Sequence, residues 1–217
     1  MSKLEKALVV PFAVFIGLLA LELVPLTARV DARYVVYPLQ TLVCAGLLWR
    51  YWRFYQFNGI KNVGFTVGIG VLVFVLWIAP QVFLGVAPRV AGFNPNVLAE
   101  APLLYWGNLT MRFLRLVVVV PLIEELFWRG FLLRYLIGSP VDKIPFGKFT
   151  WWSFLLVSVG FMLEHQGADY AAALVTGALY NWVAYRTKSQ GSCVLAHAVT
   201  NLLLGIYIMV SGQWGFW

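Results

Sequence analysis

Long apolar stretches, separated by short polar connections, recur along this chain of 217 residues. Several of them are near or above the ~18 residues that a helix needs to cross the hydrocarbon core of a bilayer. Charged residues make up only 12% of the chain, which is about half of their usual share in soluble domains. The sequence therefore predicts an all-α, polytopic transmembrane helix bundle.

The apolar stretches predict about seven membrane spans. Their expected limits are 7–26, 34–48, 63–86, a long segment 103–137, 150–166, 168–185 and 192–210. The segment 103–137 is too long for one straight crossing and contains Pro121, so we expect an interfacial helix up to about Arg112 or Arg115, followed by a span. An eighth span could lie within 103–115. Gly64 and Gly68 form a GxxxG pair, which favours close helix packing within the chain.

The positions of lysine and arginine predict the orientation of these spans. Most basic residues lie in the connections that the predicted topology places on one side, at 3–6, 50–61, 134–148 and 186–188. Cytoplasmic loops carry an excess of Lys and Arg, so we expect this side, with the N-terminus, to be cytoplasmic. Arg29, Arg33 and Arg89 are exceptions.

The net charge of +7 does not indicate a nucleic-acid-binding protein. The basic residues are scattered singly between apolar runs and form no basic cluster or basic-aromatic stripe. Cys44 and Cys193 lie in or beside predicted spans without local pairing, so we expect two buried thiols. We expect one integral membrane domain over residues 1–217, with the lipid bilayer as its surroundings.

Two adjacent carboxylates, Glu124 and Glu125, lie inside one of the apolar segments, with Arg129 four residues after the second. A charged side chain at the centre of a membrane costs roughly 2.5–3.5 kcal/mol by insertion scales, so these groups need partners or a function. Residues four apart share one face of a helix, so Glu125 and Arg129 are expected to pair. Glu124 is rotated by about 100° to a different face.

Both histidines of the chain also lie in predicted spans. His165 follows Phe161 by four residues, and His197 precedes Asn201 by the same interval on one helix face. Tilted helices would bring Glu124 and the two histidines to one cavity that opens towards the cytoplasm. A water held between Glu124 and a histidine would then be deprotonated by the carboxylate. The second histidine and Asn201 would donate hydrogen bonds to the oxyanion on a scissile carbonyl.

Other interpretations of these polar groups stay open at this point. They could form a buried cluster that fixes helix register in a non-catalytic membrane scaffold or an immunity-type protein. One Glu and two His are also possible zinc ligands, as in a zinc-dependent membrane metalloprotease, although no HExxH is present. Intramembrane Glu and His occur in proton relays and transporters too, but the chain lacks the repeated halves common in such folds.

Three motifs, in this order, make the chain similar to the CAAX prenyl protease and bacteriocin-processing (CPBP, Abi) family of intramembrane endopeptidases. They are EExxxR at Glu124-Glu125-Leu-Phe-Trp-Arg129, FxxxH at Phe161-Met-Leu-Glu-His165, and HxxxN/D at His197-Ala-Val-Thr-Asn201. The match covers residues 121–201. We accordingly expect a protease-like motif core at residues 113–211.

The resemblance implies a glutamate-type peptidase that works without a metal or other cofactor, by a water that Glu124 and His165 activate. The residues that it assigns to the site are Glu124, His165, His197 and Asn201 as the catalytic set, with Glu125, Arg129 and Phe161 in support. The two catalytic residues of the last motif would shape the oxyanion hole. The substrate would be a membrane-associated protein or peptide, and the location the bacterial inner (cell) membrane.

One residue departs from the family's broad pattern. Glu164 directly precedes His165, where relatives more often carry a small or apolar residue. This extra acid either acts on His165 or faces another helix.

Overall fold

The computed structural model describes residues 1–23, 32–87, 92–165 and 167–217. All regular structure in these ranges is helical, which confirms the predicted all-α class. Arg29 and Arg89, two exceptions to the distribution of basic residues, lie outside the described residues, as do the ends of the predicted spans 7–26 and 150–166. Cys44 and Cys193 are free and buried, as predicted.

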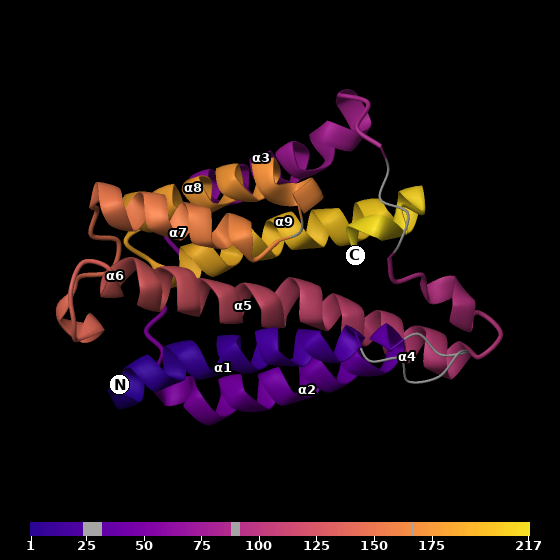
Figure 1. The fold of residues 1–217 in the computed structure, drawn as a ribbon, viewed down its shortest axis with the longest axis horizontal. Coiled ribbons are helices and arrows are strands. Elements are labelled where there is room, and N and C mark those ends of the chain that lie inside the picture. Colours follow the sequence, from indigo (N-terminus) through magenta and orange to yellow (C-terminus); the bar gives the residue numbers. More distant parts are fainter. Residues whose placement is uncertain (24–31, 88–91, 166) are drawn as a thin grey trace.

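The helices coincide with the predicted apolar segments. They are α1 (Lys3–Leu19), α2 (Arg33–Tyr51), α3 (Val63–Phe83), α4 (Pro102–Leu114), α5 (Val120–Glu125), α6 (Leu133–Tyr135), α7 (Trp151–Leu163), α8 (Tyr170–Thr187) and α9 (Gln190–Ser211). Figure 1 shows α4, α5 and α6 as one long segment between the α1–α2 pair and the group formed by α3, α7, α8 and α9.

Two helices of the described part, α3 and α9, are long and apolar enough to cross a membrane. The helix α7 is apolar but shorter, with 13 residues. The number of about seven spans therefore stays a prediction.

The segment from 102 to 135 is helical without a break, so the expected interruption near Arg112 or Arg115 is wrong. Two π-helical turns, Arg115–Val119 and Leu126–Leu132, flank α5 instead. Pro121 lies in the first turn of α5, and the N–H of Val120 donates to the Arg115 carbonyl, five residues back. The wider π turn displaces the carbonyl that the proline ring would meet, so the helix continues through Pro121.

One end of the bundle collects the connections that are rich in lysine and arginine (Figure 1). Hydrogen bonds join these connections: Gly191 N–H to the Phe57 carbonyl at 2.7 Å, Tyr55 Oη–H to the Ala7 carbonyl at 3.1 Å, and Val141 N–H to Glu5 Oε1 at 3.4 Å. We call this the basic end (residues 1–8, 52–62, 134–150 and 186–192). The grouping of these connections at one end agrees with the predicted topology.

The helices α3 and α9 approach each other closely at Gly70. A Cβ atom there would lie 2.6 Å from the Ala196 carbonyl oxygen, and Thr200 Oγ1 donates a hydrogen bond to the Gly70 carbonyl at 2.8 Å. Gly64 and Gly68 have no heavy atom within 4 Å of a Cβ position, so the prediction that this pair packs against another helix of the chain is wrong. Gly70 lies two residues beyond Gly68 and therefore on a nearly opposite face of α3.

Candidate active site

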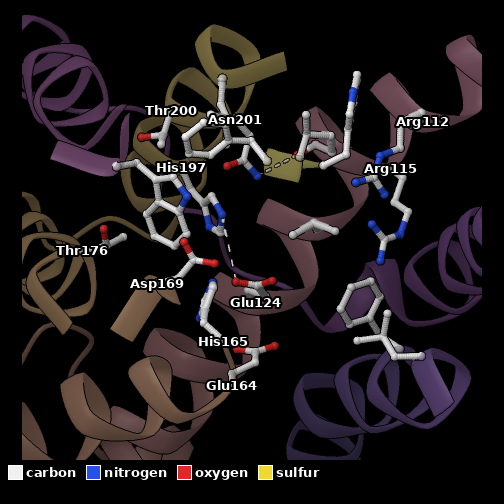
Figure 2. Close-up of a pocket in the computed structure, with 18 of the residues that line it drawn as sticks. Arg112, Arg115, Glu124, Glu164, His165, Asp169, Thr176, His197, Thr200 and Asn201 are labelled. Atoms are coloured by element: carbon white, nitrogen blue, oxygen red, sulfur yellow. Dashed lines mark hydrogen bonds and ion pairs between the residues drawn. The ribbon is translucent and has the colours of Figure 1, made fainter. Parts of the chain in front are cut away.

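A cavity of ≈ 430 Å³ lies among the helices that carry the three motifs. The cavity is lined by Glu124 from α5, by His165 two residues beyond the end of α7, and by His197 and Asn201 from α9. Phe161 lines it as well. Figure 2 shows the side chains of Glu124, His165 and His197 close together, although they come from separate parts of the chain. The structure thus brings the four residues predicted to be catalytic to one place.

Glu125 and Arg129 lie behind the cavity and form the predicted pair. Arg129 Nη1 donates to Glu125 Oε1 at 2.9 Å, and both side chains are fully buried. The other guanidinium nitrogens reach α8, where Nε donates to Asn181 Oδ1 and Nη2 to the Gly177 carbonyl, both at 3.0 Å. The guanidinium carbon also lies 5.0 Å from the ring centre of Phe161. A buried arginine bonded on all these sides fixes α5 against α8.

His197 is held between two carboxylates. Its Nδ1 lies 3.1 Å from Glu125 Oε1, and its Nε2 lies 4.0 Å from Glu124 Oε2. An ionised carboxylate only accepts hydrogen bonds, so we assign a proton to Nδ1, which donates it to Glu125. Since 4.0 Å is too long for a hydrogen bond, Nε2 faces Glu124 across the cavity without bonding to it.

The backbone of its own helix orients His165. The ring nitrogen Nδ1 lies 2.8 Å from the Phe161 carbonyl oxygen, which can only accept, so Nδ1 donates and Nε2 is left for another partner. The ring packs against Trp77, with centres 5.2 Å apart, and against the Phe161 ring, with centres 4.9 Å apart. In Figure 2, His165 lies next to Glu124.

Asn201 lies one helical turn beyond His197. Its Nδ2 donates a hydrogen bond to the Leu116 carbonyl at 2.8 Å. Leu116 belongs to the π turn before α5, and such turns recur at functional sites. One amide hydrogen of Asn201 remains for a second acceptor.

The side chain of Glu164 contacts another helical segment. Its Oε2 accepts a hydrogen bond from Trp128 Nε1 at 2.9 Å. The residue thus faces another helix, and it also lines the cavity together with Glu124 and Asp169. The departure from the family pattern therefore places an additional carboxylate in the wall of the cavity.

Several residues of the site were not predicted from the sequence. Tyr180 donates to Thr200 Oγ1 at 2.7 Å, and its ring centre lies 5.1 Å from that of His197. Asn181, the partner of Arg129, is fully buried. A buried asparagine in an apolar helix needs a polar partner, and that was the signal that could have identified it.

The cavity reaches the end of the bundle opposite to the basic end. Its lining includes Arg33 at the start of α2, Asp169 just before α8 and the C-terminal residues 215–217. The helices α2 and α8 finish at the basic end and α9 begins there, so these lining residues belong to the other end (Figure 1). The expectation of a cavity open towards the basic connections is therefore wrong. The spacing of residues along each helix does not show where neighbouring helices leave a gap.

Within the described ranges, no group of three or more His, Cys, Asp or Glu side chains is arranged to hold a metal ion. Glu124, His197 and His165 share the cavity without forming such a group. The metal-free mechanism implied by the resemblance stays a prediction, with the zinc site as its alternative.

The fold and the site together have the features of an all-helical protein with charged groups around a buried cavity. Residues 106–203 match the family described as Type II CAAX prenyl endopeptidase Rce1-like. This match includes all three motifs and confirms the resemblance of the segment 106–203 to this family of endopeptidases. A search of curated proteins and a search of solved structures gave no match.

Proposed function

We propose that the protein is an intramembrane endopeptidase that hydrolyses a peptide bond of a membrane-associated protein or peptide. The observation that carries this proposal is the presence of Glu124, His165, His197 and Asn201 in the wall of one cavity. The Rce1-like family supports a peptidase. In this proposal, residues 1–217 form one integral membrane domain of about seven spans, and the motif core at 113–211 carries the site.

Glu124 is the proposed general base. Its Oε2 is buried and accepts no hydrogen bond from the described residues, so it can accept one from a water molecule. His165, with Nε2 left for another partner, would hold the same water. Transfer of the water proton to Glu124 leaves a hydroxide that attacks the scissile carbonyl carbon, and Glu124 then passes the proton to the leaving amine.

His197 and Asn201 are the proposed donors to the oxyanion. Asn201 has one amide hydrogen left after its bond to Leu116. His197 would donate through Nε2 as an imidazolium, with Glu125 at Nδ1 as counter-charge. Removing a single donor of this kind lowers kcat by a factor of about 10²–10³.

We place the opening of the site on the extracytoplasmic side of a bacterial inner membrane. The basic end should be cytoplasmic by the excess of lysine and arginine there, and the cavity reaches the opposite end. Ser2→Cys at the basic end and Gln213→Cys near the opposite end test this, because the native thiols are buried. A membrane-impermeant maleimide added to intact cells should label Gln213→Cys and spare Ser2→Cys. The reverse pattern would overturn the orientation.

The activity can be tested by mapping new peptide termini in membranes of cells that produce the protein. Glu124→Gln and His165→Asn should lower the yield of processed termini by about 10²-fold or more. The matched control is Glu100→Gln, which neutralises an exposed carboxylate away from the cavity. Processing by the two site variants at the level of the control would contradict the proposal.

The competing function is a non-catalytic membrane scaffold or immunity-type protein. In that case no terminus would depend on the native protein, and the same substitutions would act on stability alone. Thermal unfolding in detergent, measured on the same variants, separates the two functions. The peptidase proposal predicts that His165→Asn loses processing while its melting temperature stays near that of the native protein.

A further inference from the structure

The basic end carries a large excess of positive charge. Its four segments contain nine lysines and arginines but only two acids, Glu5 and Asp142. Glu5 is 6% exposed, and its oxygens accept hydrogen bonds from the Ser2 and Val141 N–H groups. Eight of the nine cations are exposed, namely Lys3, Lys6, Arg53, Lys61, Lys143, Lys148, Arg186 and Lys188. Within the described part of the chain, none of these eight side chains forms an ion pair.

The exposed cations form one continuous surface, because the segments that carry them are joined. The Lys61 N–H donates to Ser192 Oγ at 2.9 Å, and Lys188 Nζ donates to the Gly147 carbonyl. A third hydrogen bond, donated to Glu5, joins the connection that contains Gly147 to the N-terminal helix α1. Like charges gathered on one surface repel one another. A partner that brings several negative charges to this surface relieves the repulsion.

Four exposed tryptophans border this surface. Trp49 and Trp52 lie at the end of α2 and just after it, and Trp151 and Trp152 lie in the first turn of α7. Their exposed fractions are between 52% and 83%. Tryptophan is enriched at the interface between a membrane and water, where its ring sits at the level of the lipid headgroups. The tryptophans thus indicate that the basic end lies at headgroup level.

The exposed charge is concentrated at this one end of the bundle. Elsewhere among the described residues, the exposed charged side chains are Arg50, two residues before the basic end, and Glu100, just before α4. A partner recognised by its charge therefore meets the protein from one side. Anionic lipids give the cytoplasmic leaflet of a cell membrane a negative surface potential, and the basic end is the predicted cytoplasmic side.

We infer that the basic end binds the headgroups of anionic phospholipids. Each lysine or arginine near an anionic membrane surface is attracted to it, and clusters of about four to eight such residues bind acidic lipids. The exposed tryptophans favour a lipid over a soluble polyanion, because their rings enter the interfacial layer that the same headgroups form. Phosphatidylglycerol, whose phosphate is not neutralised by an ammonium group, is the simplest lipid of this class. The inference goes beyond the proposed peptidase function and does not depend on it.

Tryptophan fluorescence in lipid vesicles tests the inference. The protein is reconstituted into phosphatidylcholine vesicles that contain the same small share of either brominated phosphatidylglycerol or brominated phosphatidylcholine. Bromine quenches the tryptophans that it contacts, so the depth of quenching reports which lipid lies beside the exposed indoles. We expect phosphatidylglycerol to be favoured about fivefold or more, the effect of a single basic residue near an anionic surface. The preference should shrink at about 1 M NaCl, which screens charges beyond ~3 Å, and equal quenching by the two lipids at low salt would overturn the inference.

Variants of the basic end then assign the preference. A combined variant that removes four of the eight exposed cations should lower the preference about twofold or more. Its substitutions are Lys3→Gln, Lys6→Gln, Lys143→Gln and Lys148→Gln. The matched control replaces the same four lysines by arginine, which keeps the charge and should keep the preference. An unchanged preference in the glutamine variant would overturn the inference. Should that variant fail to fold, the two brominated lipids compared on the native protein still decide it.

Free phosphate is the other source of the chemistry that a cationic surface recognises. Sodium phosphate added at constant ionic strength should leave the lipid preference unchanged, and loss of the preference would identify a site for free phosphate and overturn the lipid assignment. The Glu124→Gln protein should show the preference of the native protein, because the measurement needs no hydrolysis. Processing of peptide termini without any lipid preference would refute the lipid-binding surface alone. A lipid preference without any processed terminus would refute the peptidase alone.

Discussion

His197 Nδ1 lies 3.1 Å from Glu125 Oε1, and this oxygen also accepts a hydrogen bond from Arg129 Nη1 at 2.9 Å. One buried oxygen atom thus connects the histidine of α9 to the arginine that fixes α5 against α8. The orientation of His197 therefore depends on a carboxylate that does not itself line the cavity.

Glu125→Gln should both destabilise the protein and lower its activity. The amide leaves the buried charge of Arg129 without its counter-charge, and breaking a buried ion pair costs about 3–5 kcal/mol. It also replaces the acceptor that holds His197. Thermal unfolding in detergent and the yield of processed termini measure the two effects.

A double variant provides the control for this pair. Adding Arg129→Met to Glu125→Gln removes the charge that the first substitution leaves unpaired. The losses of stability of the single variants Glu125→Gln and Arg129→Met, added together, should therefore exceed the loss of the double variant. Strictly additive losses would show that the two side chains do not stabilise each other.

The bond from Trp128 to Glu164 predicts different results for two substitutions of the acid. Glu164→Gln keeps an acceptor for the indole N–H and should change the free energy of unfolding by no more than about 0.5 kcal/mol. Glu164→Leu leaves this buried donor unpaired and should cost about 1–3 kcal/mol. Combining Glu164→Leu with Trp128→Phe, which removes the donor, should recover part of that cost. Equal stability of the Gln and Leu variants would mean that the hydrogen bond contributes nothing.

Gly70→Ala should destabilise the contact between α3 and α9. The new Cβ atom would lie 2.6 Å from the Ala196 carbonyl oxygen and 2.9 Å from Val199 side-chain atoms, so the helices must separate. We expect a loss of about 1–3 kcal/mol, as for other overpacked positions. Gly68→Ala is the matched control, because nothing lies within 4 Å of its Cβ position. The control should be neutral or stabilising by up to about 1 kcal/mol, the helix propensity of Ala over Gly. A similar response to both substitutions would contradict the close approach.

Treatment with 1,10-phenanthroline should leave the proteolytic activity unchanged. The described part of the chain offers no group of three or more ligands for a metal ion, and Glu125 occupies Nδ1 of His197. The assay compares the yield of processed termini in membranes with and without the chelator. Activity that disappears with the chelator and returns with added zinc would favour the metalloprotease alternative.

The helices could be located from the sequence because apolar length is a strong constraint. A backbone in an apolar medium must satisfy its hydrogen bonds internally, so each long apolar run has to be helical. The break expected near Arg112 or Arg115 could not be excluded in this way. A proline usually ends or kinks a helix, and the π turn that accommodates Pro121 has no signature in single residues.

The motif spacings identified the residues of the candidate site but not the shape of its cavity. Polar residues in apolar helices are recognisable because each needs a partner, and Glu124 and His197 stand out in this way. Arg112 and Arg115 carry the same signal, but the length of the segment 103–137 favours the interfacial end of a helix for them. Their place in the cavity depends on Tyr37 and Gln40 from a distant segment, and no local pattern encodes that contact.

The two π turns around α5 determine the direction in which the Glu124 and Glu125 side chains leave the helix. A π turn spaces its hydrogen bonds over five residues and an α turn over four, and each residue advances an α-helix by about 100°. Inserting one residue into Arg115–Val119, where the turn is already π-helical, would thus keep every charged group that follows while turning Glu124 by about 100° away from His197. A one-residue change of length in this segment would therefore disrupt the arrangement of Glu124 and His197 more completely than most changes of side chain.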